Sequence, residues 1–448
     1  MKKKIGIIGS GFSGICAALN LIGNKKFSVT IIDKSKIFGG VMYSSKIDNF
    51  YVDNGTHHFD AIPIELGKTI REIMNNKVNN LRYASASFFG GLISKFYSYP
   101  DLNNLPINKK KKILKEVMKI KIKNKIPKLK SMQDLYKKSF GYTASKIFAQ
   151  LFKNLYGIAP DKIEISFKDS SNLGRLKFLQ DNKMLDLKKK YKLFDYAFAA
   201  KRSGVRHQKD NLVDNLYPIN KKGLRGWCEQ TKNYLKKKGV RIINDFQLND
   251  IHEKKNKIYV ISDYKKIEFD KLIWSNTNYN ELAKLAKIKT KNFNHPVPLV
   301  YYTIITKKKN LNPKIVYLHN FDKQKIFFRC HQAGLLSKQI DKNNNSFLTV
   351  ECFTKLNSKL WNNPEKYINR IWSDLIKLNF IYKNSKILKT NIKKIETSLI
   401  LPKVGKQNYD LKIFKKLKKK YKNILLPENK TFFRRQIYDE MKSLVKTL

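Results

Sequence analysis

The sequence predicts an α/β fold with a further part in which helices accompany an antiparallel sheet. Three observations predict it. The chain opens with a short apolar strand, a glycine-rich turn and a helix-like run; residues 108 to 150 place apolar side chains at helical spacing; and residues 297 to 353 contain alternating aromatic and β-branched runs between turns. With 448 residues, 42% of them hydrophobic, the chain is long enough for two domains or one large discontinuous domain.

The opening stretch, residues 3 to 23, reads KKIGIIGSGFSGICAALNLIG. A basic start before an apolar run also suits a secretory signal, but a signal peptide has a continuous apolar segment, and glycines interrupt this one. The stretch fits a strand from Lys4 to Ile8, a G-x-G-x-x-G turn and a helix-like run from Ile15 to Ile22. The turn consists of Gly9, Ser10, Gly11, Phe12, Ser13 and Gly14.

Each glycine of this turn has a mechanical role. Gly9 permits the tight turn, Gly11 lets the backbone approach a diphosphate, and Gly14 lets the helix pack closely on the strand. A second strand, Phe27 to Ile32, ends at Asp33, whose carboxylate is suited to accept hydrogen bonds from a ribose. The sequence therefore predicts a Rossmann-like dinucleotide-binding unit. The competing interpretation is a plain tight turn beside a surface carboxylate.

A glycine pair follows Asp33 after six residues, and residues 49 to 61 read NFYVDNGTHHFDA. With these motifs the sequence resembles the group of FAD-dependent amine oxidases, protoporphyrinogen oxidases and UDP-galactopyranose mutases. The resemblance implies FAD, with the segment Asp53-x-Gly55-x-His57-x-Phe59 beside its isoalloxazine ring. The implied cofactor-binding residues after the glycine turn are Asp33, Lys34, Gly39, Gly40, Val41, Gly55, His57 and Phe59. In the group an Arg or Asn follows the glycine pair, where this chain has Val41.

Two later stretches extend the resemblance. Residues 217 to 260 are similar to the group's return into the FAD domain, where a strand near Leu248 lends its backbone to the adenine. Residues 96 to 106 and 155 to 163 resemble motifs of the substrate domain. The resemblance implies a discontinuous FAD-binding domain of residues 1–60, 210–275 and 390–448. An α+β substrate-binding domain then comprises 61–209 and 276–389, with a helical insertion at about 108–200.

The C-terminal region departs from the group. Its members have a Gly-Asp or Gly-Arg motif at the flavin ribityl and phosphate, whereas residues 423 to 441 contain no glycine. Backbone approaches a ligand less easily without glycine, so either a different contact replaces the motif or FAD binding has weakened. Arg434 and Arg435 are the residues able to neutralise phosphate charge there.

Two residues are candidates for catalysis. The resemblance puts His57 beside the flavin, where a neutral imidazole can exchange hydrogen-bond roles; a buried histidine that caps a turn is the alternative. Arg329 lies in a strand-like segment, and strand alternation places it on the same face as Phe327, a wall suited to bind a carboxylate or diphosphate. The alternative for Arg329 is a salt bridge at the sheet edge. No spacing of potential ligands predicts a metal site.

The net charge of +57 favours an anionic partner, but it is nearly all lysine, is spread along the chain and comes with no nucleic-acid motif. We therefore expect no nucleic-acid partner; contact with an anionic membrane remains open, because residues 108 to 150 form a basic amphipathic stretch. The four cysteines, Cys16, Cys228, Cys330 and Cys352, lie far apart and fit a reduced compartment. The expected location is cytoplasmic, with a peripheral site at the inner face of the membrane as a variant.

The leading hypothesis is a FAD-dependent oxidoreductase that removes a hydride from a small substrate, either free or lipid-linked. A flavin-dependent mutase of a nucleotide sugar is the first alternative, favoured by GTHHF and YSYP in the sequence. The second alternative is a protein that keeps the fold and binds a partner without turnover, motivated by the altered C-terminal motif.

Overall fold

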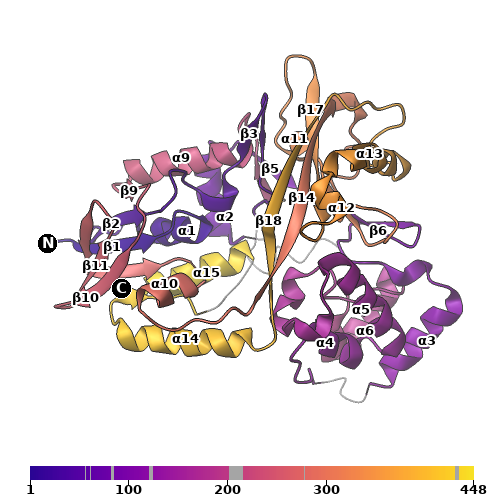
Figure 1. Cartoon of the computed structure of the whole chain (residues 1–448), viewed down its shortest axis with the longest axis horizontal. Helices are drawn as coiled ribbons and strands as arrows, with labels where there is room; N and C mark the ends of the chain where they lie inside the picture. Colours follow the sequence, from indigo (N-terminus) through magenta and orange to yellow (C-terminus); the bar gives the residue numbers. More distant parts are fainter. Residues whose placement is uncertain are drawn as a thin grey trace.

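The computed structural model describes residues 1–55, 57–60, 62–81, 85–120, 125–200, 215–276, 278–428 and 433–448. A five-stranded parallel sheet contains the first strand of the chain at its centre. Its order is β19-β13-β1-β2-β9, with the bounds β1 (Lys3–Ile8), β2 (Phe27–Ile32), β9 (Arg241–Ile243), β13 (Lys271–Trp274) and β19 (Ile424–Leu425). Segments from the start, middle and end of the chain therefore build one sheet (Figure 1).

Both faces of this sheet are covered because its strands are apolar on both sides. On one face Ile5, Ile7 and Ile31 share a core with helices α1 (Phe12–Leu21), α2 (Ile64–Ile73), α9 (Gly223–Lys237) and α15 (Arg434–Val445). On the other face Leu272 and Trp274 contact a small antiparallel sheet and two helices. These elements are β10 (Asp250–Lys254), β11 (Lys257–Ile261), β12 (Lys266–Phe269), α10 (Asn280–Leu285) and α14 (Lys406–Lys420).

A seven-stranded sheet forms the second layer, in the order β18-β14-β17-β16-β15-β6-β7. Its strands are β6 (Ser85–Phe89), β7 (Leu92–Lys95), β14 (Asn294–Lys307), β15 (Tyr317–Asn320), β16 (Arg329–His331), β17 (Asn345–Phe353) and β18 (Lys389–Pro402). All neighbours are antiparallel except β15 and β6. The antiparallel sheet predicted from residues 297 to 353 is confirmed. Residues 390–402, expected in the FAD-binding domain, instead form β18, which pairs with β14 along most of its length.

In the sequence, helix α11 (Ala333–Leu336) lies between β16 and β17. Two more helices, α12 (Lys359–Asn362) and α13 (Ile368–Lys377), lie between β17 and β18. The short hairpin β3 (Ser45–Ile47) and β4 (Phe50–Val52) leads toward the predicted site. Strands β5 (Val78–Leu81) and β8 (Asn215–Pro218) pair antiparallel and connect the segments on either side of the helical insertion.

The helical insertion has a core of its own. It consists of α3 (Ile107–Met118), α4 (Met132–Ser139), α5 (Tyr142–Tyr156), α6 (Asp181–Lys190) and α7 (Lys192–Ala197). Aromatic side chains such as Tyr136, Phe148 and Phe152 are fully buried in it. The α4 helix begins with a capping box in which Ser131 and Asp134 bond each other's backbone, so the sequence sets this start locally. The predicted helical part is confirmed.

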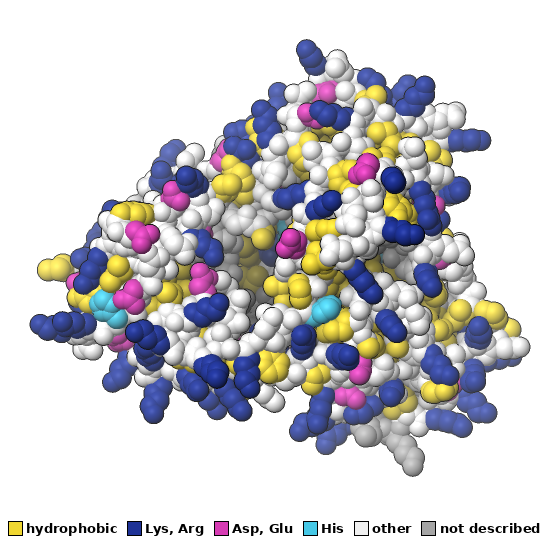
Figure 2. Space-filling model, viewed as in Figure 1, with side chains coloured by type: hydrophobic (Ala, Val, Ile, Leu, Met, Phe, Trp, Pro, Cys, Tyr) yellow, Lys and Arg dark blue, Asp and Glu magenta, His cyan; other side chains and the backbone are white. Residues whose placement is uncertain are grey.

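None of the helices in the described ranges is both long enough and apolar enough to cross a membrane. Figure 2 shows lysine and arginine side chains over the whole visible face, with a hollow between the part that holds the parallel sheet and the part that holds the seven-stranded sheet. The spread of positive charge agrees with the lysine-rich composition.

Candidate functional site

The glycine turn lies at the carboxyl end of β1 and has the geometry that its motif requires. Gly9 has a φ of +103°, which favours glycine. A β-carbon at Gly14 would lie 1.9 Å from the carbonyl oxygen of Gly9, so only glycine permits this approach of α1 to the strand. Nothing lies within 4 Å of a β-carbon built at Gly11, and no side chain caps α1. Open space therefore remains in front of the helix N-terminus, where backbone N–H groups attract an anion.

Asp33 lies at the end of β2 and orients this turn. Its Oδ2 accepts hydrogen bonds from the Ser10 backbone N–H at 2.5 Å and from the Ser10 hydroxyl at 2.7 Å, while its Oδ1 accepts one from the Ser35 N–H at 2.7 Å. A carboxylate has about four acceptor sites, so capacity for ribose hydroxyls remains. Lys34 is exposed and its ammonium lies 3.4 Å from Glu281.

The glycine pair meets the glycine turn. The Gly39 N–H donates to the Ser10 carbonyl at 3.1 Å, and a β-carbon at Gly40 would lie 3.2 Å from the Cα of Gly11. Both residues of the pair have positive φ. Two glycine-rich segments thus form one surface of bare backbone, beside which Val41 is 62% exposed.

The segment from Asp53 to Phe59 joins the same site. Asp53 is buried and accepts hydrogen bonds from Ser44 and from Tyr217. Burial raises the pKa of this carboxyl to about 6, although the two hydrogen bonds act in the opposite direction. Gly55 has a φ of +116°, and Phe59 packs edge-on against Trp227 with ring centroids 4.9 Å apart. Sequence reasoning did not identify Ser44, Tyr217 or Trp227, which hold the segment from other parts of the chain.

Arg434 closes this site at the N-terminus of α15. Its guanidinium lies 5.1 Å from the ring centroid of Phe12 and 3.2 Å from the sulfur of Met42. It also lies 3.3 Å from Nδ1 of His57, and since arginine can only donate, Nδ1 accepts and the ring proton sits on Nε2. The Nε of Arg434 is buried, and no described group accepts a hydrogen bond from it. Burial lowers the pKa of Arg434.

His57 is a neutral imidazole in this setting. Burial, with the positive charges of Arg434 and Arg329, lowers its pKa to about 3, and the same causes lower that of His58 to about 4. The His58 ring is 5.9 Å from Tyr317, which stacks at 4.3 Å on the fully buried His331. Tyr317 and His331, which the sequence did not single out, thus form with His58 one wall of the site, called here the wall behind His57.

Arg329 forms a partly buried ion pair. Its guanidinium binds both carboxylate oxygens of Glu351, the residue opposite it on β17, at 2.8 and 2.7 Å. The predicted pairing with Phe327 on one face is wrong because β16 begins only at Arg329. Phe327 packs in the core with Cys330, while the Arg329 guanidinium lies 5.8 Å from the ring of Phe328. The charge of Arg329 still acts on His57.

Leu248 lies two residues before β10 and near the end of β2, because the N–H of Phe246, two residues earlier, donates to the Asp33 carbonyl at 3.0 Å. Its side chain packs in the core on the α14 face of the sheet. Leu248 therefore lies in a segment next to Asp33, and its contact with an adenine stays a prediction.

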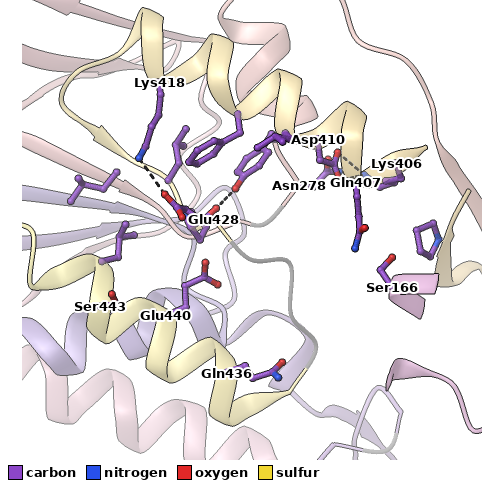
Figure 3. A pocket seen from close by; sticks show the side chains of 18 of the residues that line it. Ser166, Asn278, Lys406, Gln407, Asp410, Lys418, Glu428, Gln436, Glu440 and Ser443 are labelled. Carbon is purple, nitrogen blue, oxygen red and sulfur yellow. Dashed lines mark hydrogen bonds and ion pairs between the residues drawn. The ribbon is translucent and has the colours of Figure 1, made fainter. Parts of the chain in front are cut away.

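A large groove lies apart from the glycine turn, between α14 and α15 at the β19 edge of the parallel sheet (Figure 3). Its volume is about 1670 Å³, and apolar side chains such as Phe414 and Leu444 line it together with carboxylates such as Glu428. None of the predicted cofactor-binding residues lines this groove. In the part of the chain that the structure describes, no group of histidine, cysteine, aspartate and glutamate is arranged to hold a metal ion.

The residues present fit FAD. The two glycine segments offer bare backbone for a diphosphate, and Asp33 has acceptor capacity for a ribose. Arg434 supplies a cation that contacts Met42 and His57, with the Asp60 carboxylate near enough to raise its pKa. The glycine-free C-terminal region thus brings a side-chain cation to the site.

Comparisons with known proteins agree with this geometry. The family model of the NAD(P)-binding Rossmann-like domain matches residues 7–75. The fold resembles a reduced UDP-galactopyranose mutase, with a TM-score of 0.71 and 16% identity, over 100% of this chain and 93% of the other. It also resembles a putative protoporphyrinogen oxidase from Exiguobacterium sp. 255-15, with a TM-score of 0.65 and 14% identity, over 100% and 98%.

A putrescine oxidase bound to putrescine gives a TM-score of 0.61 at 11% identity, over 100% of this chain and 98% of that enzyme. No curated protein matches the sequence. Residues 7–75 therefore match the NAD(P)-binding Rossmann-like domain, and the whole chain shares its fold with these three solved structures.

Proposed function

We propose that this chain binds FAD and is a FAD-dependent oxidoreductase that removes a hydride from a small substrate, free or lipid-linked. One observation carries the proposal: the glycine turn, Asp33, the glycine pair, His57 and Arg434 come from four separated segments and converge on one site. A fold retained only as a scaffold has no need for an inward cation beside open glycine backbone.

Each of these groups has a task in holding the cofactor. Backbone N–H groups at the start of α1 bind the diphosphate, and Asp33 binds a ribose with the oxygen lone pairs that Ser10 and Ser35 leave free. Arg434 adds a positive charge at a site where related flavoproteins use glycine-containing backbone. Bound FAD supplies the acceptor for a hydride, so the protein needs no strong acid or base of its own.

The chain's own residues then position substrate and exclude water. Burial, together with the guanidinium groups of Arg434 and Arg329, keeps His57 neutral, and the backbone of Asn54 also bonds its ring, so this residue adds a fixed, uncharged group to the site. Behind it, Tyr317 and the buried His331 form a stacked wall. The ion pair of Arg329 with Glu351 leaves this wall without a net charge from those two residues.

The mutase alternative requires cations that bind the diphosphate of a nucleotide sugar. Arg329 was the residue expected in this role, and its bidentate pairing with Glu351 makes it a poor anion ligand. The likeness to the mutase structure, at 16% identity, is a likeness of fold. We therefore keep hydride removal as the proposed reaction.

The test starts with the visible absorption spectrum of the protein purified under mild conditions. We expect a flavin band that bleaches with dithionite, or that appears after incubation of folded protein with FAD. Reduction of the oxidised flavin by a panel of amines and other hydride donors, followed under nitrogen, then separates substrate oxidation from isomerisation of UDP-galactopyranose by the reduced protein. Folded protein that takes up no FAD at all would refute the proposal.

A further inference from the structure

Two helices carry lysine stripes that face outward. In α3 the residues Ile113 and Val117 are buried, which turns Lys111, Lys112, Lys115 and Lys119 toward solvent. Six of the thirteen residues from 107 to 119 are lysine, against about one basic residue in five along the chain. The single acid among them, Glu116, is occupied at the start of α5, where it accepts hydrogen bonds from the Thr143 N–H and hydroxyl at 2.7 Å.

Helix α14 repeats this arrangement. Ile413 and Leu417 are buried, and the opposite face exposes Lys412, Lys415, Lys416 and Lys419. The acid of this helix, Asp410, is buried and bound by Lys406 at 2.8 Å. None of the eight stripe lysines forms an ion pair with a residue in the described ranges.

The lysines within each stripe repel one another. Lys111 and Lys115, like Lys415 and Lys419, are four residues apart, and like charges at this spacing destabilise a helix. An anionic surface placed against them would remove this repulsion. Lys110 and Lys420 show the contrast, because each turns back and donates to a backbone carbonyl, at 2.7 and 2.6 Å respectively.

The two helices are about 300 residues apart in sequence. Figure 1 shows α14 at the lower left of the view and α3 at the lower right, with α4 between them, so the edge that joins them includes part of the helical insertion; Figure 2 shows lysine and arginine side chains at both ends of that edge. Exposed apolar side chains accompany each stripe. Ile107 and Tyr142 are 65% and 64% exposed beside the α3 stripe, and Leu411 is 51% exposed beside the α14 stripe.

We propose that this edge, defined by the eight stripe lysines with Ile107, Tyr142 and Leu411, docks on an anionic lipid bilayer. Clustered lysines attract acidic headgroups, and apolar side chains among them enter the interfacial layer. The stripes contain no arginine, the residue that reads guanine and stacks on bases, so a lipid surface fits them better than a nucleic acid. The inference is independent of the cofactor and of the reaction.

The test measures binding to vesicles of phosphatidylcholine alone and of phosphatidylcholine with 30% phosphatidylglycerol, by flotation at several salt concentrations. One variant replaces the four α3 stripe lysines by Gln, and a second replaces the four α14 stripe lysines. The control replaces Lys308, Lys309, Lys338 and Lys342, which are exposed near the far ends of β14 and β17. All variants change the net charge equally, and circular dichroism confirms that each is folded.

We expect salt-sensitive binding to the acidic vesicles only, a loss of about tenfold or more in each stripe variant, and little change in the control. Equal losses in all three variants would show that net charge alone acts, and would overturn the inference. Failure of the unmodified chain to bind acidic vesicles would also overturn it. Tighter binding to duplex DNA or RNA, with the same dependence on the stripes, would assign the edge to a different partner and reject the lipid surface.

Discussion

At the scale of single residues, Arg434 is the cation that the C-terminal region brings beside Phe12, Met42 and His57. We expect Arg434→Met to weaken FAD binding by about tenfold or more, because one charge-assisted contact contributes roughly 1.5–3 kcal/mol. Arg435→Met is the control, since Arg435 is exposed and lies 3.5 Å from Asp439. The dissociation constants come from quenching of flavin fluorescence on titration of the apoprotein. Equal affinities of the two variants would remove Arg434 from the cofactor site.

Asp53 makes a second residue-scale prediction, in the pH dependence of stability. Its pKa is raised by burial to about 6, so its contribution to stability is fully present below the unfolded value near 3.8 and is lost as pH rises through 6. When the pH falls from 7.5 to 5.5, this group alone raises the free energy of unfolding of the wild type by about 1 kcal/mol. Urea unfolding of wild type and Asp53→Asn at both pH values isolates it. A difference between the two proteins that stays constant with pH would contradict the raised pKa.

The residue motifs show what sequence can reveal of the site. Gly14 was predictable because a helix packed closely on a strand excludes a β-carbon there, and Asp33 was predictable as the carboxylate at the end of β2 beside the turn, while its contact with a ribose stays a prediction. The Glu351 partner of Arg329 was not predictable, because it comes from cross-strand register, which the alternation of one strand does not reveal. The same holds for the stacking of His331 on Tyr317, two residues that only the pairing of β15 with β16 brings together.

At the scale of elements, the turn between β1 and α1 allows a paired test of structure against binding. A β-carbon at Gly14 would clash with the Gly9 carbonyl, whereas one at Gly11 meets nothing within 4 Å, and Gly11 has an ordinary φ of −70°. We expect Gly14→Ala to lose at least about 2 kcal/mol of stability and to bind no FAD. Gly11→Ala should keep its stability and still lose FAD affinity, because its methyl group fills the space for the diphosphate.

Thermal unfolding and FAD titration on both variants check this pair. Normal FAD affinity in a stable Gly11→Ala protein would show that the diphosphate lies elsewhere.

The strands β1 and β2 and the sheet of residues 297 to 353 could be predicted because apolar patterning within each segment indicates them. By contrast, most residues of β18 are exposed or partly exposed, Lys393 and Lys394 among them, so its sequence does not indicate a strand that pairs with the buried β14.

At the scale of the whole molecule, a strongly cationic chain keeps several histidines neutral inside it. His319 and His331 are 7% and 1% exposed, and both ring nitrogens of His331 lack a hydrogen-bond partner among the described residues. Burial lowers the pKa of His319 to about 3 and that of His331 well below its usual value, and Arg329 acts in the same direction on both. His57 and His58 add to this group.

The sign of this effect opposes that of Asp53. A histidine with a lowered folded pKa stabilises the protein above the unfolded value near 6.5, and the contribution is lost as pH falls, because only the unfolded chain takes up the proton. When the pH falls from 7.0 to 5.0, one such histidine lowers the free energy of unfolding by about 2 kcal/mol. Four histidines in the described ranges act in this direction, against the carboxyls of Asp53, Asp60 and Glu164, whose pKa burial raises. We therefore expect acid lability to dominate, and protonation adds to the self-repulsion of a chain already at +57.

His331→Phe tests this balance directly. The phenyl ring can keep the stacking on Tyr317 while it removes two unpaired nitrogens, so we expect no loss of stability at pH 7.0. At pH 5.0 the variant should be more stable than wild type by about 2 kcal/mol relative to their difference at pH 7.0. The free energies come from urea unfolding, with His252→Gln, which replaces an exposed imidazole, as the control. If wild type and His331→Phe lose the same stability between the two pH values, His331 is protonated in the folded protein and the neutral wall behind His57 does not exist.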